Sequence, residues 1–188
     1  MKRCAWCDGN ELYKNYHDKE WGVPLHDENK LFEFLILEGA QAGLSWLTVL
    51  KKRENYRDAF DNFNLKKVAN YNEKKKKQLL ENQGIIRNKL KIDSAIRNAK
   101  VFLEIQNEYG SFDNYIWTFV KHKPIKNKIK SIKEIPSKTE LSDKISKDLK
   151  NRGMNFVGST IIYAFMQAIG IVNDHTIDCF RYKQNLIK

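Results

Sequence analysis

The sequence predicts an all-α protein with a substantial core, and three observations support this. Apolar residues recur at helical spacing over long segments, without the strict alternation that marks strands. Only 9 Gly and 3 Pro occur in 188 residues, too few for the many tight turns of an all-β fold. Hydrophobic residues make up 41% of the chain, enough for a substantial core. At this length we expect one domain over residues 1–188, either undivided or in two lobes.

The first long predicted helix begins after Asp27, a residue type that favours the N-cap position. Its apolar positions run from Leu31 to Gly39 with helical spacing. A short loop over residues 40–44 separates it from a second helix expected from Ser45 to Lys52. The preceding residues, up to about 27, are rich in aromatic side chains but follow no clear period.

Three further helices are expected in the second half of the chain. One has its apolar face from Ile92 onward and ends at Gly110. Another covers residues 142–150, and the last covers 161–169 and ends at Gly170. Residues 121–136 are strongly basic and contain two prolines, so they predict an extended connection, and we expect no strand pairing.

The charge balance favours a polyanionic partner. Basic residues exceed acidic ones by 34 − 23 = 11, which makes nucleic acid the first candidate. The alternative is a lysine-rich surface that never contacts nucleic acid. No apolar run reaches transmembrane length, and the first six residues lack the apolar core of a signal peptide. We therefore expect no membrane association and a cytoplasmic, nucleoid-associated location.

A glycine-containing hairpin is predicted between the last two helices. Gly153 and Gly158 stand five apart and flank the apolar pair Phe156 and Val157. Backbone N–H groups in such a turn, followed by a helix N-terminus, can hold a DNA phosphate without reading bases. An ordinary helical hairpin with a glycine C-cap is the alternative, and the motif alone leaves both open.

Glu38 ends an apolar run on the first long helix. A carboxylate there costs free energy unless it is paired or meets a cationic ligand. The alternative is a helix-end Glu that reaches water. Trp46, at the start of the next helix, offers a flat face for an extruded base, and Gln41 and Leu44 lie on a loop that could enter a duplex. Core packing is the alternative role for Trp46.

Two cysteines and two histidines near the chain ends are candidate metal ligands. Cys4 and His17 lie near the N-terminus, and His175 and Cys179 are four residues apart near the other end. On a helix, the second pair would share one face, and the four together would form a closed, structural zinc site. Cys4 and Cys7 form a competing pair, so spacing alone leaves the ligand set open.

The residues discussed so far occur in long, ungapped motifs that resemble a known bacterial family, the 3-methyladenine DNA glycosylase I family. The resemblance covers nearly the whole chain. It is carried by residues 3–6, 16–24, 37–39, 41–46, 50–57, 84–87, 156–158 and 172–175.

This resemblance implies a helix-hairpin-helix glycosylase fold of two helical lobes, with the hairpin at about 145–170. It implies one structural Zn²⁺ per chain, joining the segments about 1–20 and 172–185. The implied zinc ligands are Cys4, His17, His175 and Cys179, which leaves Cys7 without a role. The implied base pocket consists of Trp6, Tyr16, Trp21, Glu38 and Trp46, with Glu38, Tyr16 and Trp46 acting in the reaction. The implied DNA contacts are Gln41, Gly43, Leu44, Gly153, Phe156, Gly158 and Ser159.

The implied activity is hydrolysis of the N-glycosidic bond of 3-methyladenine in double-stranded DNA, by a monomer with no obligate protein partner. Asn173 stands where many helix-hairpin-helix glycosylases have a catalytic Asp, and residues 156–160 contain no nucleophilic Lys. We therefore expect a monofunctional enzyme that leaves an abasic site. Two other hypotheses are a non-catalytic DNA-binding module and a glycosylase of broader range that also acts on 7-methylguanine or oxidised bases.

Overall fold

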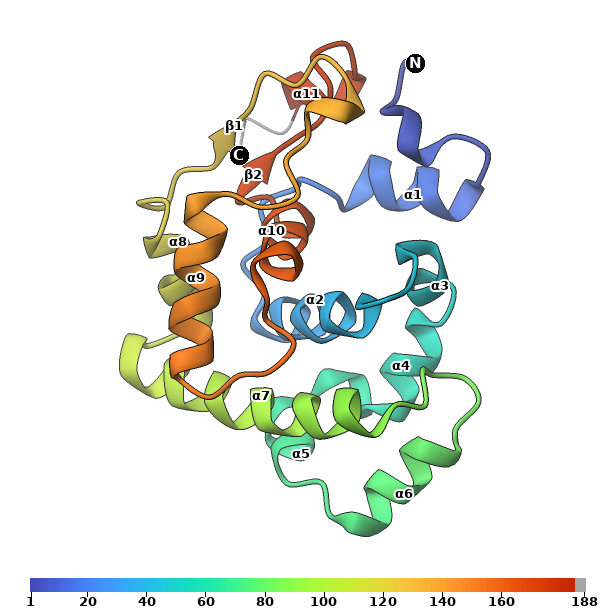
Figure 1. The fold of residues 1–188 in the computed structure, drawn as a ribbon, viewed down its shortest axis with the longest axis vertical. Helices are drawn as coiled ribbons and strands as arrows, with labels where there is room; N and C mark the ends of the chain where they lie inside the picture. Colours follow the sequence, from blue (N-terminus) through green and yellow to red (C-terminus); the bar gives the residue numbers. More distant parts are fainter. Residues whose placement is uncertain (185–188) are drawn as a thin grey trace.

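The computed structural model describes residues 1–184 and confirms the predicted all-α class (Figure 1). Within these residues the chain forms eleven α-helices, three short 3₁₀ helices and two strands of two residues each. None of the described helices is both long and apolar enough to cross a membrane. Residue 185, the last of the predicted C-terminal zinc-bound segment, lies outside the described residues.

The α-helices differ widely in length, from the 5-residue α3 to the 21-residue α7. Their bounds are α1 Glu11–Lys19, α2 Glu28–Gln41, α3 Trp46–Leu50, α4 Arg53–Ala59, α5 Leu65–Ala69, α6 Glu73–Glu81, α7 Lys89–Tyr109, α8 Phe112–Thr118, α9 Glu140–Asn151, α10 Ser159–Ala168 and α11 Phe180–Gln184. The 3₁₀ helices are η1 Ala5–Cys7, η2 Asp61–Phe63 and η3 Ile132–Glu134, and the strands are β1 Ile125–Lys126 and β2 Val172–Asn173.

Helix α2 is the centre of the packing, in contact with α10 on one side and α7 on another (Figure 1). Asp27 caps it as predicted, accepting a hydrogen bond from the Lys30 amide. The sequence pattern predicted one apolar face, but every residue from Leu31 to Ala40 is buried. Because α2 is covered on all sides, its two mid-helix glutamates, Glu33 and Glu38, are buried as well.

The expectation of no strand pairing is wrong over a short stretch. Strands β1 and β2 pair in parallel, with Ile125 opposite Val172 and Lys126 opposite Asn173. The basic connection makes one further parallel bridge, between Ile129 and Thr176, and has η3 as its one helical turn among the described residues. A strand of two residues is too short to show alternation, so the sequence pattern could not reveal it.

The predicted helix boundaries hold for the long helices and fail for the short ones. Helix α7 ends at Gly110, which adopts the left-handed conformation (φ +81°), as the sequence suggested. The single helix expected from Ser45 to Lys52 ends at Leu50, and α4 begins three residues later. Ser45 is the N-cap of α3, where its hydroxyl accepts a hydrogen bond from the Thr48 amide.

Gly170, which follows α10, allows a close backbone contact that positions the segment after α1. It has φ +74°, and a Cβ there would lie 2.4 Å from the Pro24 nitrogen and 2.4 Å from the Val23 carbonyl carbon. We expect Gly170→Ala to lower the free energy of unfolding by at least about 3 kcal/mol, because two backbones would have to separate. Urea denaturation measures this loss.

Gly110→Ala is the matched control for this substitution. Gly110 has a similar φ of +81°, but nothing lies within 4 Å of the added Cβ. Only the cost of the left-handed backbone remains, about 1–2 kcal/mol. Equal losses in the two variants would contradict the proposed contact between Gly170 and the Val23–Pro24 backbone.

Candidate base-binding pocket and metal centre

A pocket of about 340 Å³ opens where α1, α2, α3 and α10 meet, a size typical of small-molecule sites. Glu38, Tyr16 and Trp46, the residues predicted to act in the reaction, all line it, as do Trp6 and Trp21. Gln41, predicted to probe the duplex, also reaches this pocket. The remaining lining residues are Tyr13, Ile132, Ile135, Ala164 and Gln167.

Some of the residues that the sequence analysis missed carried a detectable signal. Tyr13 precedes Tyr16 by three residues, so the two share a face of α1. Ala164 and Gln167 are likewise three apart on α10. Ile132 and Ile135 lie in and just after η3, where no periodicity marks them.

Aromatic rings form the walls of the pocket in edge-to-face and tilted arrangements. The Trp6 ring lies 5.1 Å from Trp21 and 5.4 Å from Tyr13, at steep angles to both. On the other side, Tyr16 lies 5.4 Å from Trp46. An edge-to-face contact covers one face of one ring, so the rings keep other faces available for a flat ligand.

Several polar atoms in these walls have no partner within the described part of the chain. The indole Nε1 atoms of Trp6 and Trp46 are buried and donate to nothing. No hydrogen bond joins the Tyr16 hydroxyl to residues 1–184, and burial raises the pKa of this phenol. Unpartnered buried donors are costly, so a pocket lined with them is suited to a polar ligand or ordered water.

The two buried glutamates of α2 differ in what surrounds them. Glu33 accepts hydrogen bonds from Arg53 and Arg57 and is thus neutralised by two guanidinium groups. Glu38 is only 4% exposed, and neither a hydrogen bond nor an ion pair joins its carboxylate to another described residue. A buried carboxylate without a counterion is unstable as an anion, so the structure leaves Glu38 in need of a cation.

Burial raises the pKa of Glu38 from 4.5 to about 8. The folded protein therefore holds a proton that the unfolded chain releases, and the free energy of unfolding falls as pH rises from 4.5 to 8. We expect Glu38→Gln, which cannot ionise, to be more stable than the wild type by about 4–5 kcal/mol at pH 8.5. The difference should vanish near pH 4. Parallel pH profiles from urea denaturation would contradict the burial of an unpaired carboxylate.

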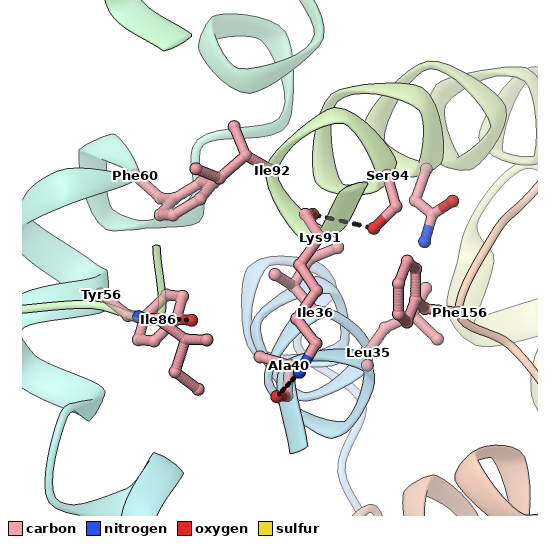
Figure 2. A pocket seen from close by; sticks show the side chains of 12 residues that line it. Leu35, Ile36, Ala40, Tyr56, Phe60, Ile86, Lys91, Ile92, Ser94 and Phe156 are labelled. Carbon is pink, nitrogen blue, oxygen red and sulfur yellow. Dashed lines mark hydrogen bonds between the residues drawn. The ribbon is translucent and has the colours of Figure 1, made fainter. Parts of the chain in front are cut away.

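The loop after α2 is anchored from α7. The Lys91 ammonium donates hydrogen bonds to the carbonyl oxygens of Ala40 (2.8 Å) and Ala42 (2.7 Å). Figure 2 shows Lys91 reaching Ala40. The residues around this contact line a cavity of about 10 Å³, room for one water at most. Beyond this anchor, Gly43 is exposed, and the Leu44 side chain is 42% exposed at the loop tip.

The predicted hairpin joins α9 to α10. Gly153 has φ +101°, and Gly158 is the N-cap of α10. Asn98 of α7 fixes the turn by bonding both the amide and the carbonyl of Asn155. The Phe156 side chain packs on α2 beside Gly39. A Cβ added to Gly39 would lie 3.2 Å from the Cβ of Phe156.

The other hairpin residues leave backbone groups available. The amides of Phe156, Val157 and Gly158 donate to no other described residue. The Ser159 hydroxyl pairs with Ser142 at 2.8 Å.

Cys4, His17, His175 and Cys179 converge, as predicted, into one buried cluster. Their ligand atoms all lie within 4.8 Å of one another. His175 and Cys179 were expected to meet on one face of a helix, but residues 175–179 are not helical. His175 follows β2, and a turn closed by the Cys179 amide and the Thr176 carbonyl (2.8 Å) brings Cys179 back towards it.

The geometry and chemistry of the cluster fit a tetrahedral metal ion. Ligands about 2.3 Å (S) and 2.0 Å (N) from such an ion stand about 3.5 Å apart. The Cys179 sulfur lies 3.4 Å from His17 Nε2 and 3.6 Å from His175 Nδ1, and the Cys4 sulfur lies 3.6 Å from the same His175 nitrogen. Hydrogen bonding to Cys4 and to the two imidazoles lowers the pKa of the Cys179 thiol, so a thiolate is favoured there.

Outer contacts orient the imidazoles and connect the cluster to the pocket. His17 Nδ1 lies 2.8 Å from Asp18, which turns Nε2 towards the cluster. His175 Nε2 lies 3.1 Å from the carbonyl oxygen of Trp21, a residue of the pocket wall. The His17 ring also stacks beside Trp21. Cys7 is buried, but its thiol bonds the Cys4 carbonyl and is not part of the cluster.

Comparisons with known proteins agree with this geometry. The family model described as methyladenine glycosylase matches residues 6–182. DNA-3-methyladenine glycosylase 1 of Escherichia coli (strain K12) is 49% identical over 185 residues, which cover 98% of this chain and 99% of that protein. The DNA-3-methyladenine glycosylase of Haemophilus influenzae is 48% identical over 177 residues, covering 94% and 96%. The structure of 3-methyladenine DNA glycosylase I from Staphylococcus aureus superposes with a TM-score of 0.93 at 34% identity, covering 100% of this chain and 98% of that one.

Agreement of the whole helical framework with solved glycosylase structures sets the class of protein as a helical DNA glycosylase. At these levels of identity and coverage, the chain belongs to the methyladenine glycosylase family. The predicted family resemblance is thus confirmed.

Proposed function

We propose that this protein hydrolyses the N-glycosidic bond of 3-methyladenine in alkylated double-stranded DNA. Glu38 is the observation that carries the proposal, because it is a buried carboxylate without a counterion in an aromatic pocket. In DNA, 3-methyladenine is a cation with a weakened bond to its sugar. The pocket supplies the two things that bind such a base, ring faces and a negative charge.

The pocket residues divide the work of binding and bond cleavage. Trp6 and Trp46 stack on the extruded base, a cation–π contact worth about 1–2 kcal/mol per ring when dry, and Trp21, at a steep angle to Trp6, closes the wall beside them. Tyr16 and Glu38 direct hydrogen bonds to its edge, and Glu38 ionises as the cation enters. The base leaves neutral, so the enzyme needs no acid to activate the leaving group. The pocket promotes bond cleavage by orienting the base and by excluding bulk water.

The neighbourhood of Asn173 supports a monofunctional enzyme that leaves an abasic site. Asn173 is 2% exposed, and its amide side chain is occupied by the Tyr182 carbonyl and the His175 amide. It therefore serves the local backbone, and a neutral carboxamide cannot act as a general base. Without a Lys at the hairpin, strand cleavage through a Schiff base has no nucleophile there.

The proposed DNA contacts use two features of the surface, the exposed loop after α2 and the free amides of the hairpin. Leu44, at the tip of the loop that includes Gly43, enters the duplex and fills the gap left by the base, with Gln41 behind it. Residues Gly153 to Ser159 approach a phosphate through the free amides of the hairpin, while Phe156 holds the turn against α2. We propose that residues 1–188 act as one such domain, as a monomer in the cytoplasm, near the chromosome.

We assign the metal as a single structural Zn²⁺ held by Cys4, His17, His175 and Cys179. Two thiolates and two imidazoles form a closed ligand set that leaves no position for a substrate. The ion would supply no step of the reaction. It would tie the chain ends together and, through His17 and His175, hold Trp21 in the pocket wall.

The experiment that tests this function follows the bases released from DNA. Zinc-loaded protein is incubated with a methylated duplex, and the free bases are separated by chromatography. We expect release of 3-methyladenine, intact strands until alkaline cleavage, and no release of 7-methylguanine or oxidised bases. Binding to the duplex without base release would instead favour a non-catalytic module, and release of all lesions would favour a broad-range enzyme.

A further inference from the structure

Gln167 is a pocket residue whose amide is held in one orientation. It lies in the last turn of α10 and lines the pocket together with Ala164, three residues earlier on the same face. Its Nε2 atom donates a hydrogen bond of 2.7 Å to Asp174 Oδ2, away from the aromatic walls.

Asp174 is fully buried and accepts three hydrogen bonds. Its Oδ1 atom accepts from the Asn127 amide (2.6 Å), and Oδ2 accepts from the Tyr163 hydroxyl and Gln167 Nε2 (2.7 Å each). A carboxylate has no hydrogen to donate. A flipped Gln167 would bring its carbonyl oxygen against Asp174, so the carboxylate forbids the flip.

The carbonyl end of the same amide is therefore the end left for a ligand. Gln167 Oε1 accepts no hydrogen bond from residues 1–184. A free glutamine can present either a donor or an acceptor to a ligand, and so it discriminates poorly between an amino group and a carbonyl group. Held by Asp174, Gln167 offers an acceptor only.

We propose that Gln167 determines which purines this pocket accepts: its carbonyl oxygen receives a hydrogen bond from the 6-amino group of the extruded base, and Asp174 positions it. The inference rests on the proposed function and adds a second acceptor to Glu38. A purine with a carbonyl at position 6 brings acceptor against acceptor and is rejected. The pocket thereby favours adenine-type over guanine-type lesions.

The test compares two free bases that differ at position 6, 3-methyladenine and 3-methylhypoxanthine, in which a carbonyl replaces the amino group. Calorimetry on the zinc-loaded full chain gives a Kd for each. We expect the wild type to prefer 3-methyladenine. Gln167→Met, similar in size but without the acceptor, should lower this preference at least about fivefold, mainly by weakening 3-methyladenine binding.

Two further variants separate specificity from stability. The Asn side chain in Asp174→Asn can donate as well as accept, so it no longer fixes the Gln167 amide. We expect this variant to lower the preference for 3-methyladenine, as Gln167→Met does. Its metal content is checked in parallel. Tyr163→Phe removes another hydrogen bond to the same carboxylate but leaves Gln167 held, so the preference should stay at the wild-type value.

An unchanged preference in Gln167→Met would overturn the inference, and so would an equal loss in Tyr163→Phe. An unchanged preference in Asp174→Asn would remove the positioning role of Asp174. A wild type that binds neither base would overturn the proposed function together with this inference. A wild type that binds both bases equally would overturn only the inference.

Discussion

Glu38→Gln should lower the rate of 3-methyladenine excision at least tenfold while leaving affinity for an undamaged duplex almost unchanged. Glutamine matches the shape of the protonated side chain, which is the form favoured in the free protein by a pKa near 8. It cannot become negative when a cationic base enters. The loss of one buried charge–charge interaction accounts for a factor of this order or larger. Single-turnover kinetics on a duplex with one 3-methyladenine measure the rate.

Glu33→Gln is the control, since it removes a carboxylate from the same helix. That residue is paired with Arg53 and Arg57 and faces away from the base pocket, so its loss should reduce stability more than excision. If the two variants excise equally well at a temperature where both are folded, Glu38 has no special part in the reaction.

Cys179→Ala should lower the free energy of unfolding in zinc by at least about 5 kcal/mol and abolish stoichiometric zinc binding. Apparent binding free energies of structural zinc sites are about 10–16 kcal/mol, and much of this stabilises the folded state. The effect should extend to the pocket, because His175 contacts the Trp21 carbonyl. Metal analysis and thermal unfolding with and without a chelator measure both changes.

Cys7→Ala is the matched control for the metal site. Cys7 is equally buried and only three residues from Cys4, yet its thiol lies outside the cluster. This variant should keep one zinc per chain and lose stability only as expected for a small buried side chain. A wild type that is metal-free, fully stable and active would contradict the structural role of zinc.

Periodicity in the sequence was enough to predict the long helices. Helix α7 and the hairpin helices have many turns, so their apolar faces repeat often enough to be recognised. Helix α5 has five residues, and β1 and β2 have two, lengths at which no period can be distinguished from chance. Their structure is set by tertiary contacts.

The pocket residues that lie in family motifs were predicted. Those that only the fold brings to the pocket were missed. Glu38 was expected at the edge of an apolar face, but complete burial depends on α7 and α10 covering α2, which lies outside any local window. Gln167 shares a helical face with Ala164 and Ile135 has no periodic signal, but both reach the pocket only because α10 and the basic connection close over it. Glu33 is paired because Arg53 and Arg57 fold against it, whereas no described arginine pairs with Glu38, and the sequence does not show which glutamate the arginines reach.

The protonation state of Glu38 tests the central claim, that an unpaired buried carboxylate captures a cationic base. With glutamate labelled at the carboxyl carbon, NMR reports this state at pH 7 in the free protein and with 3,9-dimethyladeninium, a permanent cation that mimics the lesion on its sugar. We predict a largely protonated carboxyl in the free protein, ionisation on adding the cation, and no ionisation with neutral 9-methyladenine. A carboxylate already ionised in the free protein, or unaffected by the cation, would contradict the account.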